Sequence, residues 1–221
     1  MQEEALVMEK SSVVSVRKTM FLACKRTFDI FCSLIGLIML LPVFLIVSII
    51  IKIDSRGPVF LVQKRIGKNG KEFNFYKFRS MVPNADEVLK ELLKDPKYKK
   101  EWNKNQKLEH DPRITKIGKI IRKTSLDEVP QFINVFRGDM SLIGPRPLVE
   151  GELDAHNGNH EIYEKVKPGI TGWWACNGRS ATTYEQRLKL EYYYAENASL
   201  SLDIKCIFRT IKAVLFKTGA K

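Results

Sequence analysis

Two adjacent carboxylates, Asp127 and Glu128, follow a basic stretch of the chain. Ser125 and Glu128 have the spacing of a capping box, which predicts that a helix begins here with Asp127 in its first turn. Backbone N–H groups and the helix dipole favour an ionised carboxylate at that position. One interpretation is that both acids only cap the helix. The other is chemical, because an ionised Asp127 beside Arg122 and a divalent metal can attack phosphorus.

Two further motifs carry cations that suit phosphate groups. Arg146 lies between Pro145 and Pro147, so its backbone loses little entropy on ordering and its planar guanidinium can bind a phosphate. The alternative is a rigid surface turn. Lys77 and Arg79 are separated by one apolar residue at the end of a predicted strand, where both could face one way and line a pyrophosphate site. The alternative is a basic strand edge that discourages edge pairing.

A fourth motif is rich in tryptophan and glycine. Trp173 and Trp174 follow a glycine turn, and Asn177-Gly178-Arg179 comes shortly after them. Paired Trp rings can stack on a base or anchor at a membrane interface, and core packing is the alternative. The chain contains neither GxxxxGK[ST] nor GxGxxG, so nothing supports nucleotide-binding folds of those types.

Residues 30–51 form an apolar run without one charged side chain. As a straight helix the run would be about 33 Å long, enough for a hydrocarbon core of about 30 Å. Pro42 lies near its middle and predicts a kink, because proline removes a backbone hydrogen bond. Both flanks are basic, and basic flanks prefer the cytoplasm. We therefore expect a re-entrant hairpin kinked at Pro42; a single crossing and a buried core helix are the alternatives.

The remainder predicts an α+β, mostly helical chain with a small β-hairpin. The hairpin is expected from residues 59–65 and 72–78, which flank an Asn-Gly turn signal. Helical periodicity is expected over 84–94 and over 183–217, the latter interrupted near 197–199. The expected organisation has three parts, namely an interfacial lead-in over 1–29, the re-entrant helix over 30–51 and a cytoplasmic domain over 52–221.

Composition limits the classes of protein and partner. The 221 residues carry 37 Lys plus Arg against 25 Asp plus Glu, a net charge of +12. This excess calls for an anionic partner, namely nucleic acid, lipid headgroups or a phosphorylated small molecule. With 44% hydrophobic and 28% charged residues the chain is not wholly disordered, and its mean hydropathy of −0.19 excludes a polytopic membrane protein. Four cysteines without a CxxC pair indicate a reducing compartment.

Taken in order, the motifs resemble the bacterial sugar transferases known as monotopic polyprenyl-phosphate phosphoglycosyl transferases. The resemblance extends from Lys25-Arg26-x-x-Asp29 to about Thr210. The matching stretches that follow are Gly57-Pro58-Val59-Phe60, Gln63-Lys64-Arg65-Ile66-Gly67, Lys77-Phe78-Arg79-Ser80-Met81, Asp127-Glu128-Val129-Pro130-Gln131, Gly138-Asp139-Met140-Ser141-Leu142-Ile143-Gly144-Pro145-Arg146-Pro147 and Lys167-Pro168-Gly169-Ile170-Thr171-Gly172-Trp173.

The resemblance implies a reaction. A nucleoside-diphosphate sugar, commonly a UDP-sugar, would donate a sugar phosphate to polyprenyl phosphate, and the nucleoside monophosphate would leave. Asp127 would be the nucleophile that forms a covalent phosphosugar intermediate, and Glu128 would assist metal binding or activate the acceptor phosphate. Asp127 and Glu128 would hold Mg²⁺. The expected phosphate-binding residues are Lys77, Arg79, Arg122 and Arg146.

The same resemblance implies weaker contacts to the nucleotide or sugar, from Trp173, Asn177, Arg179 and Glu191. Two departures affect these contacts. Such enzymes usually read Ala-Gln-Val-Asn-Gly-Arg after Gly-Trp, where this chain has Trp174-Ala175-Cys176-Asn177-Gly178-Arg179. They often carry Asp before Tyr-x-x-Asn, where this chain has Glu191.

The competing hypothesis is a non-catalytic, membrane-anchored basic module that binds anionic lipid or nucleic acid. The acidic pair at Asp127 and Glu128 argues against it, because such a module needs no acids there. The expected partners are therefore a nucleoside-diphosphate sugar, polyprenyl phosphate and membrane lipid, without nucleic acid. The expected place is the inner cell membrane, with the catalytic domain on its cytoplasmic face. The transferred sugar, the final polymer and a homo-oligomeric state stay open.

Overall fold

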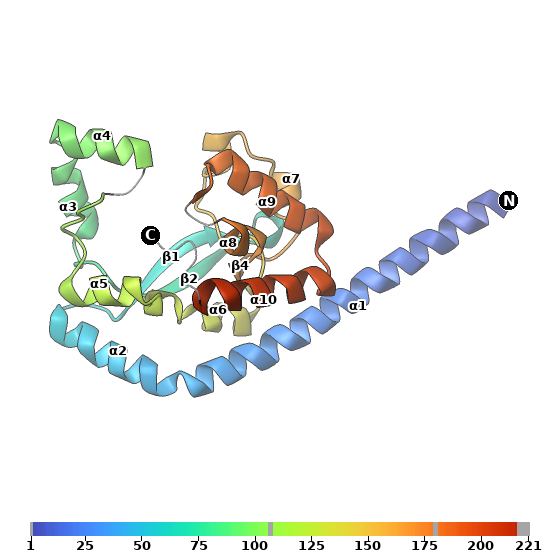
Figure 1. Ribbon diagram of the computed structural model, residues 1–221, viewed down its shortest axis with the longest axis horizontal. Coiled ribbons are helices and arrows are strands. Elements are labelled where there is room, and N and C mark those ends of the chain that lie inside the picture. Colours follow the sequence, from blue (N-terminus) through green and yellow to red (C-terminus); the bar gives the residue numbers. More distant parts are fainter. Residues whose placement is uncertain (1, 106–107, 179–180, 216–221) are drawn as a thin grey trace. The chain divides into compact units, whose positions relative to one another are not determined.

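The computed structural model describes residues 2–105, 108–178 and 181–215 (Figure 1). Helices dominate these residues, and the strands form two small two-stranded sheets, so the expected mostly helical chain with a small sheet is confirmed. The chain divides into two compact units. Unit 1 comprises Met1–Leu37, Lys64–Phe75 and Gln131–Lys221, and unit 2 comprises Ile38–Gln63 and Tyr76–Pro130.

The described elements follow one another along the chain as labelled in Figure 1. The helices are α1 (Gln2–Met39), α2 (Leu41–Asp54), α3 (Ala85–Leu92), α4 (Pro96–Asn105), α5 (Lys116–Lys123), α6 (Gln131–Arg137), α7 (His160–Tyr163), α8 (Trp173–Asn177), α9 (Tyr184–Asn197) and α10 (Leu200–Leu215). The strands are β1 (Phe60–Ile66), β2 (Glu72–Phe78), β3 (Ser141–Ile143) and β4 (Gly169–Thr171). Short 3₁₀ turns occupy Lys68–Gly70, Leu126–Glu128 and Asp154–His156.

The predicted hairpin is confirmed as β1 and β2, within one residue at each end. Its connection is the 3₁₀ turn Lys68–Gly70, in which Asn69 has φ 57° and Gly70 has φ 70°. Asn and Gly tolerate the left-handed backbone better than other residues, which explains the sequence at this turn. The predicted interruption near 197–199 is also confirmed, since α9 ends at Asn197 and α10 begins at Leu200.

The apolar run over 30–51 is divided between two helices. α1 ends at Met39, Leu40 forms the break, and Pro42 lies in the first turn of α2. A proline there loses nothing, because a first-turn N–H has no partner within the helix. Among the described residues no single helix is both long and apolar enough to cross a membrane. Residues 18–39 of α1 and the whole of α2 are long and apolar enough only when they are taken together, and this pair is bent by 57° at the break.

Three side chains of the Lys25-Arg26-x-x-Asp29 motif attach α1 to the rest of unit 1. Lys25 Nζ lies 2.7 Å from the carboxylate of Asp203 on α10. Arg26 donates to two carbonyls at the end of α6, each at 2.7 Å. Asp29, buried, accepts from Ser141 Oγ at 3.0 Å and from a backbone N–H of β3 at 2.9 Å. These contacts give the motif a structural role.

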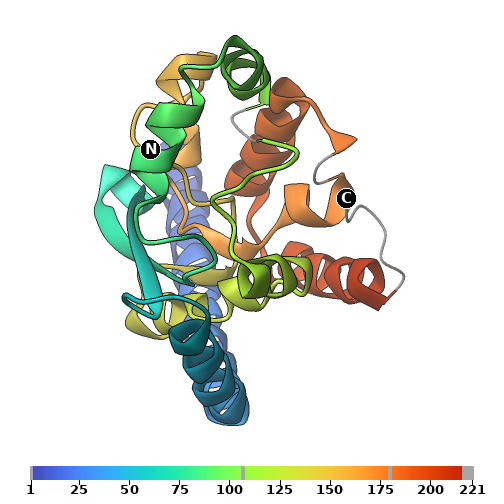
Figure 2. The same ribbon diagram turned by 90° about the vertical axis from the view of Figure 1, so that its left-hand side faces the viewer.

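The rest of unit 1 packs around a short parallel sheet. β3 pairs with β4, with Ser141 opposite Gly169 and Ile143 opposite Thr171. Helix α8 contacts both α9 and α10, and the two ribbon views show α8 and α10 side by side (Figures 1 and 2). Tyr194 of α9 is buried among these elements and donates to Asp203 at 2.6 Å.

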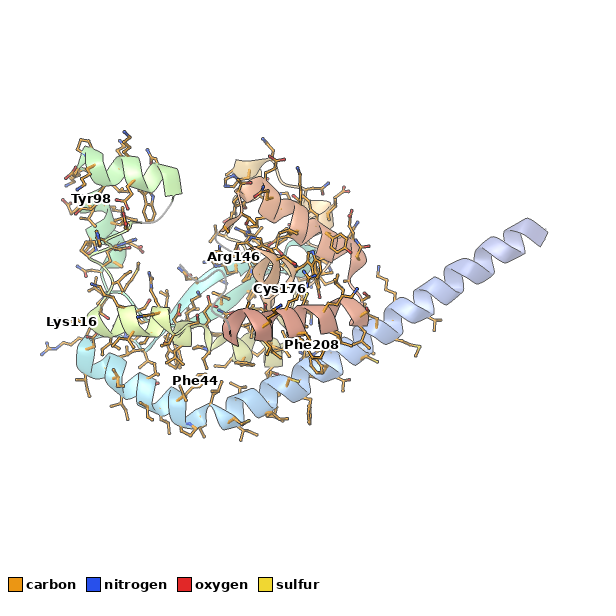
Figure 3. The ribbon with its side chains drawn as sticks, viewed as in Figure 1. Phe44, Tyr98, Lys116, Arg146, Cys176 and Phe208 are labelled. Atoms are coloured by element: carbon orange, nitrogen blue, oxygen red, sulfur yellow. The ribbon has the colours of Figure 1, made fainter. Side chains whose placement is uncertain are left out.

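The core of unit 2 is built on one face of α2. Val47 and Ile51 are buried against Phe78 of β2, and the turn residues Leu126 and Val129 pack against the same cluster. Helix α5 contacts α2 along this face. Phe44, labelled in Figure 3, lies with its ring 5.2 Å from that of Phe78. The apolar helix therefore directly supports the turn that carries Asp127.

The opposite face of α2 is apolar and exposed. Its exposed side chains recur at helical spacing, and Ile53 is 80% exposed; the set is Leu41, Leu45, Ile46, Ile49, Ile50 and Ile53. In unit 1, α1 exposes Phe28, Phe31, Leu34 and Ile35; its last two residues, Ile38 and Met39, belong to unit 2 and are also exposed. Exposed apolar side chains gathered in this way are typical of surfaces that meet a partner or a membrane.

Candidate active site

Asp127 lies in the 3₁₀ turn Leu126–Glu128, between α5 and α6. The predicted capping box is wrong. Ser125 directly follows Thr124, the C-cap of α5, and has φ 56°; its N–H donates to the carbonyl of Arg122 at 3.1 Å, and its side chain makes no capping bond. An N-cap needs extended backbone, whereas a left-handed residue is typical of a helix C-terminus. The α-helix that follows begins only at Gln131.

Lys77 of β2 faces both acids. Its Nζ lies 3.7 Å from Asp127 Oδ2 and 2.9 Å from Glu128 Oε1. The Asp127 side chain is 13% exposed and that of Glu128 is 43% exposed, so Asp127 is the more enclosed acid of the pair. The cation predicted for phosphate binding and the two predicted acids are therefore brought together within unit 2.

The environment of Asp127 disfavours its ionised form. Burial raises the pKa of Asp127, and the charge of Glu128 acts in the same direction. The ammonium of Lys77 and the guanidinium of Arg122 oppose this and favour ionisation. A desolvated carboxylate whose charge depends on nearby cations is typical of a reactive site, although structural ion pairs show the same pattern.

Arg122 reaches this cluster from α5. Its Nε donates to Ser80 Oγ at 2.8 Å. The close approach of α5 to Ser80 depends on Gly118, because a Cβ at that position would lie 1.9 Å from the Ser80 carbonyl oxygen. Gly118 therefore lets α5 lie against the segment that follows β2, which positions Arg122.

Arg79 is used differently from Lys77. It lies just beyond the end of β2 and is buried. Its Nη1 donates to the carbonyl of Arg56 at 2.8 Å, and its Nη2 donates to the carbonyl of Ser55 at 2.7 Å. Both carbonyls belong to residues that directly follow α2, so Arg79 binds the C-terminal end of this helix. Lys77 contacts the two acids, whereas Arg79 contacts the end of α2. Contrary to the expectation, the two cations therefore do not line one site together.

Arg146, labelled in Figure 3, belongs to unit 1, where two hydrogen bonds hold its backbone. Its N–H donates to Glu191 Oε1 at 3.1 Å, and its carbonyl accepts from the hydroxyl of Tyr163. Glu191 and Tyr163 are buried, whereas Arg146 itself is exposed. The guanidinium of Arg146 is thus presented to solvent from a backbone fixed by two buried side chains.

Glu191 is part of a buried network on α9 that was not anticipated. Arg187 donates to Glu152 at 3.1 Å and its guanidinium lies 4.9 Å from the ring of Trp174. Burial raises the pKa of Glu191 to about 7, against the opposing effects of the Arg146 N–H and of Arg187. Among the described residues, Arg187 Nε, Arg187 Nη2 and Glu191 Oε2 have no hydrogen-bond partner. Arg187 and Glu191 are four residues apart, a spacing at which opposite charges on a helix can pair. This spacing is the sequence signal from which the network could have been predicted.

Of the residues expected to contact the nucleotide or sugar, Trp173 and Asn177 have partners on α8 and α10. Arg209 lies over the ring of Trp173 at 4.8 Å and also bonds Asn177. Asn177 Nδ2 donates to the carbonyl of Trp173 at 2.6 Å. Arg179 lies outside the described residues.

Asp127 and Glu128 are also the expected metal ligands. No group of three or more His, Cys, Asp or Glu side chains among the described residues could hold a metal ion. Two adjacent carboxylates are nevertheless hard oxygen donors of the kind that Mg²⁺ prefers, and Mg²⁺ commonly keeps several waters and substrate phosphates as further ligands. The donor set fits a Mg²⁺ ion held mainly by its substrate.

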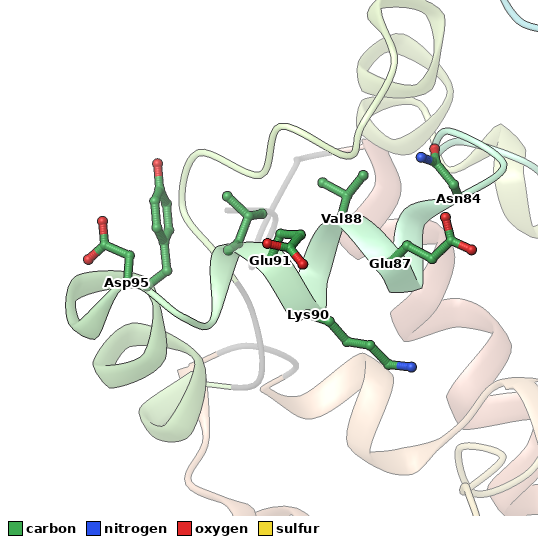
Figure 4. Close-up of a pocket in the computed structure, with 8 residues that line it drawn as sticks. Asn84, Glu87, Val88, Lys90, Glu91 and Asp95 are labelled. Atoms are coloured by element: carbon green, nitrogen blue, oxygen red, sulfur yellow. The ribbon is translucent and has the colours of Figure 1, made fainter.

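A cavity of about 760 Å³ lies elsewhere in unit 2, on α3 and α4 (Figure 4). Its lining side chains carry both signs of charge, and none of them is a predicted site residue; they are Asn84, Glu87, Val88, Lys90, Glu91, Leu92, Asp95 and Tyr98. This cavity therefore gives no support to the Asp127 site.

The chain belongs to the bacterial sugar transferase family, because the family model matches residues 20–217. The resemblance in the motifs is thereby confirmed. The chain is 45% identical over 218 residues to undecaprenyl-phosphate galactose phosphotransferase of Salmonella typhimurium. It is 44% identical over 218 residues to the UDP-galactose-lipid carrier transferase of Erwinia amylovora. Both matches cover 98% of this chain and 45% of the relative, so the chain spans less than half the length of either.

A third relative is closer in size. The exopolysaccharide production protein ExoY of Sinorhizobium fredii is 42% identical over 197 residues, which cover 89% of this chain and 87% of that protein.

Proposed function

We propose that this chain transfers a sugar phosphate from a nucleoside-diphosphate sugar, in the first instance a UDP-sugar, to polyprenyl phosphate and releases UMP. The transfer would be the first membrane step of capsule, exopolysaccharide or other glycoconjugate synthesis. The names of the relatives, which include undecaprenyl phosphate, UDP-galactose and exopolysaccharide production, support this class of reaction. The observation that carries the proposal is the enclosed carboxylate of Asp127 beside Lys77 in a member of this family.

The proposed chemistry has two displacements at one phosphorus. An Asp127 carboxylate oxygen attacks the sugar-linked phosphorus, an aspartyl–phosphorus bond forms, and the bond to the nucleoside monophosphate breaks. An oxygen of the acceptor phosphate then attacks the same phosphorus and releases Asp127. Attack by one anion on another needs nearby cations, and Lys77 and Arg122 supply positive charge beside Asp127.

Mg²⁺ would be held by Asp127 and Glu128 together with donor phosphates, and when bound it would offset the negative charge of the pyrophosphate. Arg146, with its fixed backbone, is proposed to hold a phosphate oxygen. Arg79 is left out of the phosphate-binding set, because both terminal nitrogens of its guanidinium already bind the end of α2.

We further propose that α1 and α2 enter the inner cell membrane from the cytoplasmic face and leave by the same face. The exposed apolar side chains of both helices and the break at Leu40 support this topology. A re-entrant anchor would hold the enzyme at the depth where a polyprenyl phosphate presents its phosphate, with the catalytic residues on the cytoplasmic side.

The test is a donor panel with detergent-solubilised full-length protein, polyprenyl phosphate and Mg²⁺. UMP release with one UDP-sugar, and an intact-protein mass increased by one phosphosugar when acceptor is withheld, are expected. Asp127→Asn should abolish both signals, whereas the exposed Asp86→Asn on α3 should retain both. A fully active Asp127→Asn protein, or no UMP release with any nucleoside-diphosphate sugar, would overturn the proposal.

A further inference from the structure

A second cavity, of about 300 Å³, lies within unit 1, and none of its lining residues is assigned to the reaction. It is formed by the hairpin turn between β1 and β2, by the turn after α6 and by the residue before the Pro-Gly that opens β4. The lining residues are Gly67, Lys68, Asn69, Lys71, Glu72, Phe73, Gly138, Asp139 and Lys167.

Three lysines line this cavity without a direct ion pair among the described residues. In the part of the chain that the structure describes, Lys68, Lys71 and Lys167 take part in no ion pair. The two acids of the lining have their own cations, since Glu72 lies 3.9 Å from a lysine of β1 and Asp139 lies 3.8 Å from Arg137. The positive charge of the lysines is therefore available to a ligand.

A fourth cation stands beside the cavity. A Cβ on Gly138, which has φ 92°, would lie 3.2 Å from Arg26 Nη2 and 3.4 Å from Lys167 Nζ. Glycine is thus required by the backbone and also leaves room for these two side chains. Burial lowers the pKa of Lys167, and the positive charges of Arg26 and Lys68 lower it further, against the opposing effects of the Asp29 and Asp139 carboxylates. Mutual repulsion of this kind is relieved when an anion binds.

Arg26 lies beside the cavity and just ahead of the part of α1 that we propose to enter the membrane. Arg26 lies on α1, and the apolar run begins four residues later at Ile30, which is about 6 Å along a helix. Phe28 and Phe31 of the same stretch are exposed. If this part of α1 meets the bilayer, the cations of the cavity lie at the level of the headgroup phosphates.

We propose that the cavity lined by Lys68, Lys71 and Lys167 binds the phosphate of an anionic phospholipid headgroup. The inference rests on the proposed membrane placement of α1, but not on the proposed reaction. Lysine ammonium groups bind phosphate as point charges and hold anionic headgroups near a membrane surface. A free phosphate offers the same chemistry, so the experiment must separate the two sources.

The experiment measures phospholipid retained by the detergent-solubilised full-length protein, by native mass spectrometry with equimolar phosphatidylglycerol and phosphatidylcholine and without donor. The wild type should retain phosphatidylglycerol preferentially. Changing all three lysines, by Lys68→Gln, Lys71→Gln and Lys167→Gln, should lower that preference by about a hundredfold. The matched control carries Lys97→Gln, Lys99→Gln and Lys100→Gln on the exposed face of α4, loses the same charge and should keep the preference.

A further arm adds inorganic phosphate to the wild type, with chloride at equal ionic strength as its control. Phosphatidylglycerol should stay bound in both. The proposal is overturned if the triple variant of Lys68, Lys71 and Lys167 keeps its preference for phosphatidylglycerol, or if the α4 control loses this preference to the same extent. It is also overturned if inorganic phosphate, but not chloride, displaces phosphatidylglycerol from the wild type. UMP release by the cavity variant is measured separately, so a failure of the lipid site is distinguishable from a failure of the proposed reaction.

Discussion

The ammonium group of Lys77 lies 3.7 Å from the carboxylate of Asp127, although fifty residues separate them in sequence. The same nitrogen lies 2.9 Å from Glu128. Burial of Asp127 opposes its ionisation and Lys77 favours it, so this contact raises the share of Asp127 that is ionised at a given pH.

Replacement of Lys77 should move the acid limb of the pH profile. In Lys77→Met the pKa of Asp127 should rise further above its ordinary value, because the largest opposing charge is gone. The ionised nucleophile then forms only at higher pH, and the acid limb of kcat/KM should shift upward. Lys90→Met, an exposed change on α3, serves as the control. If the acid limb lies at the same pH in both variants, Lys77 does not affect the ionisation of Asp127 and the prediction is wrong.

Removal of the charge at Asp127 should not destabilise the fold. The pKa of Asp127 is raised in the folded state, so this state holds its proton more tightly than the unfolded chain does. The contribution of this group to stability therefore falls as pH rises above its ordinary value of 3.8. Asp127→Asn should melt at or above the wild-type temperature at pH 8, and the difference should shrink toward pH 4. A Tm below wild type at pH 8 contradicts this assignment.

Glu191 should give the protein a pH-dependent stability near neutrality. Its pKa is raised from 4.5 to about 7 by burial, so the folded state keeps the proton over this interval and its contribution to stability falls as pH rises through it. Glu191→Gln keeps an acceptor for the Arg146 N–H but cannot ionise. Thermal melts of both proteins should agree most closely at pH 5, and the variant should be the more stable at pH 8. Parallel Tm profiles would show that Glu191 does not titrate there.

Replacement of Arg79 should lower the stability of the fold, because its guanidinium binds backbone carbonyls at the end of α2. Arg79→Met leaves the carbonyls of Ser55 and Arg56 without this donor, which should cost about 2–4 kcal/mol of unfolding free energy. Arg79→Lys should restore only part of this, because an ammonium cannot reproduce the planar fork. Thermal melting of both variants beside Lys90→Met checks the prediction, and a wild-type Tm for Arg79→Met rejects it.

Features governed by neighbouring residues could be predicted from the sequence. The alternation of apolar residues and the Asn-Gly signal placed β1 and β2 within a residue, and Asn69 and Gly70 adopt the expected positive φ. The helix expected over 84–94 is α3, over Ala85–Leu92. The order of short motifs was also sufficient for the family, which the match over 20–217 confirms. Local backbone preferences and linear order are properties that a sequence carries directly.

The chain itself thus determined its local elements, its excess of positive charge and its family, whereas the tertiary structure decided what each charged side chain does. Ser125 has the sequence pattern of an N-cap but lies in a left-handed conformation just after the C-cap of α5. Of the two cations at the end of β2, Lys77 contacts the acids, whereas Arg79 binds the end of α2. The physical reason is that burial and the charge partners of a group come from residues that are remote in sequence. Both depend on how α2, α5 and the hairpin pack together.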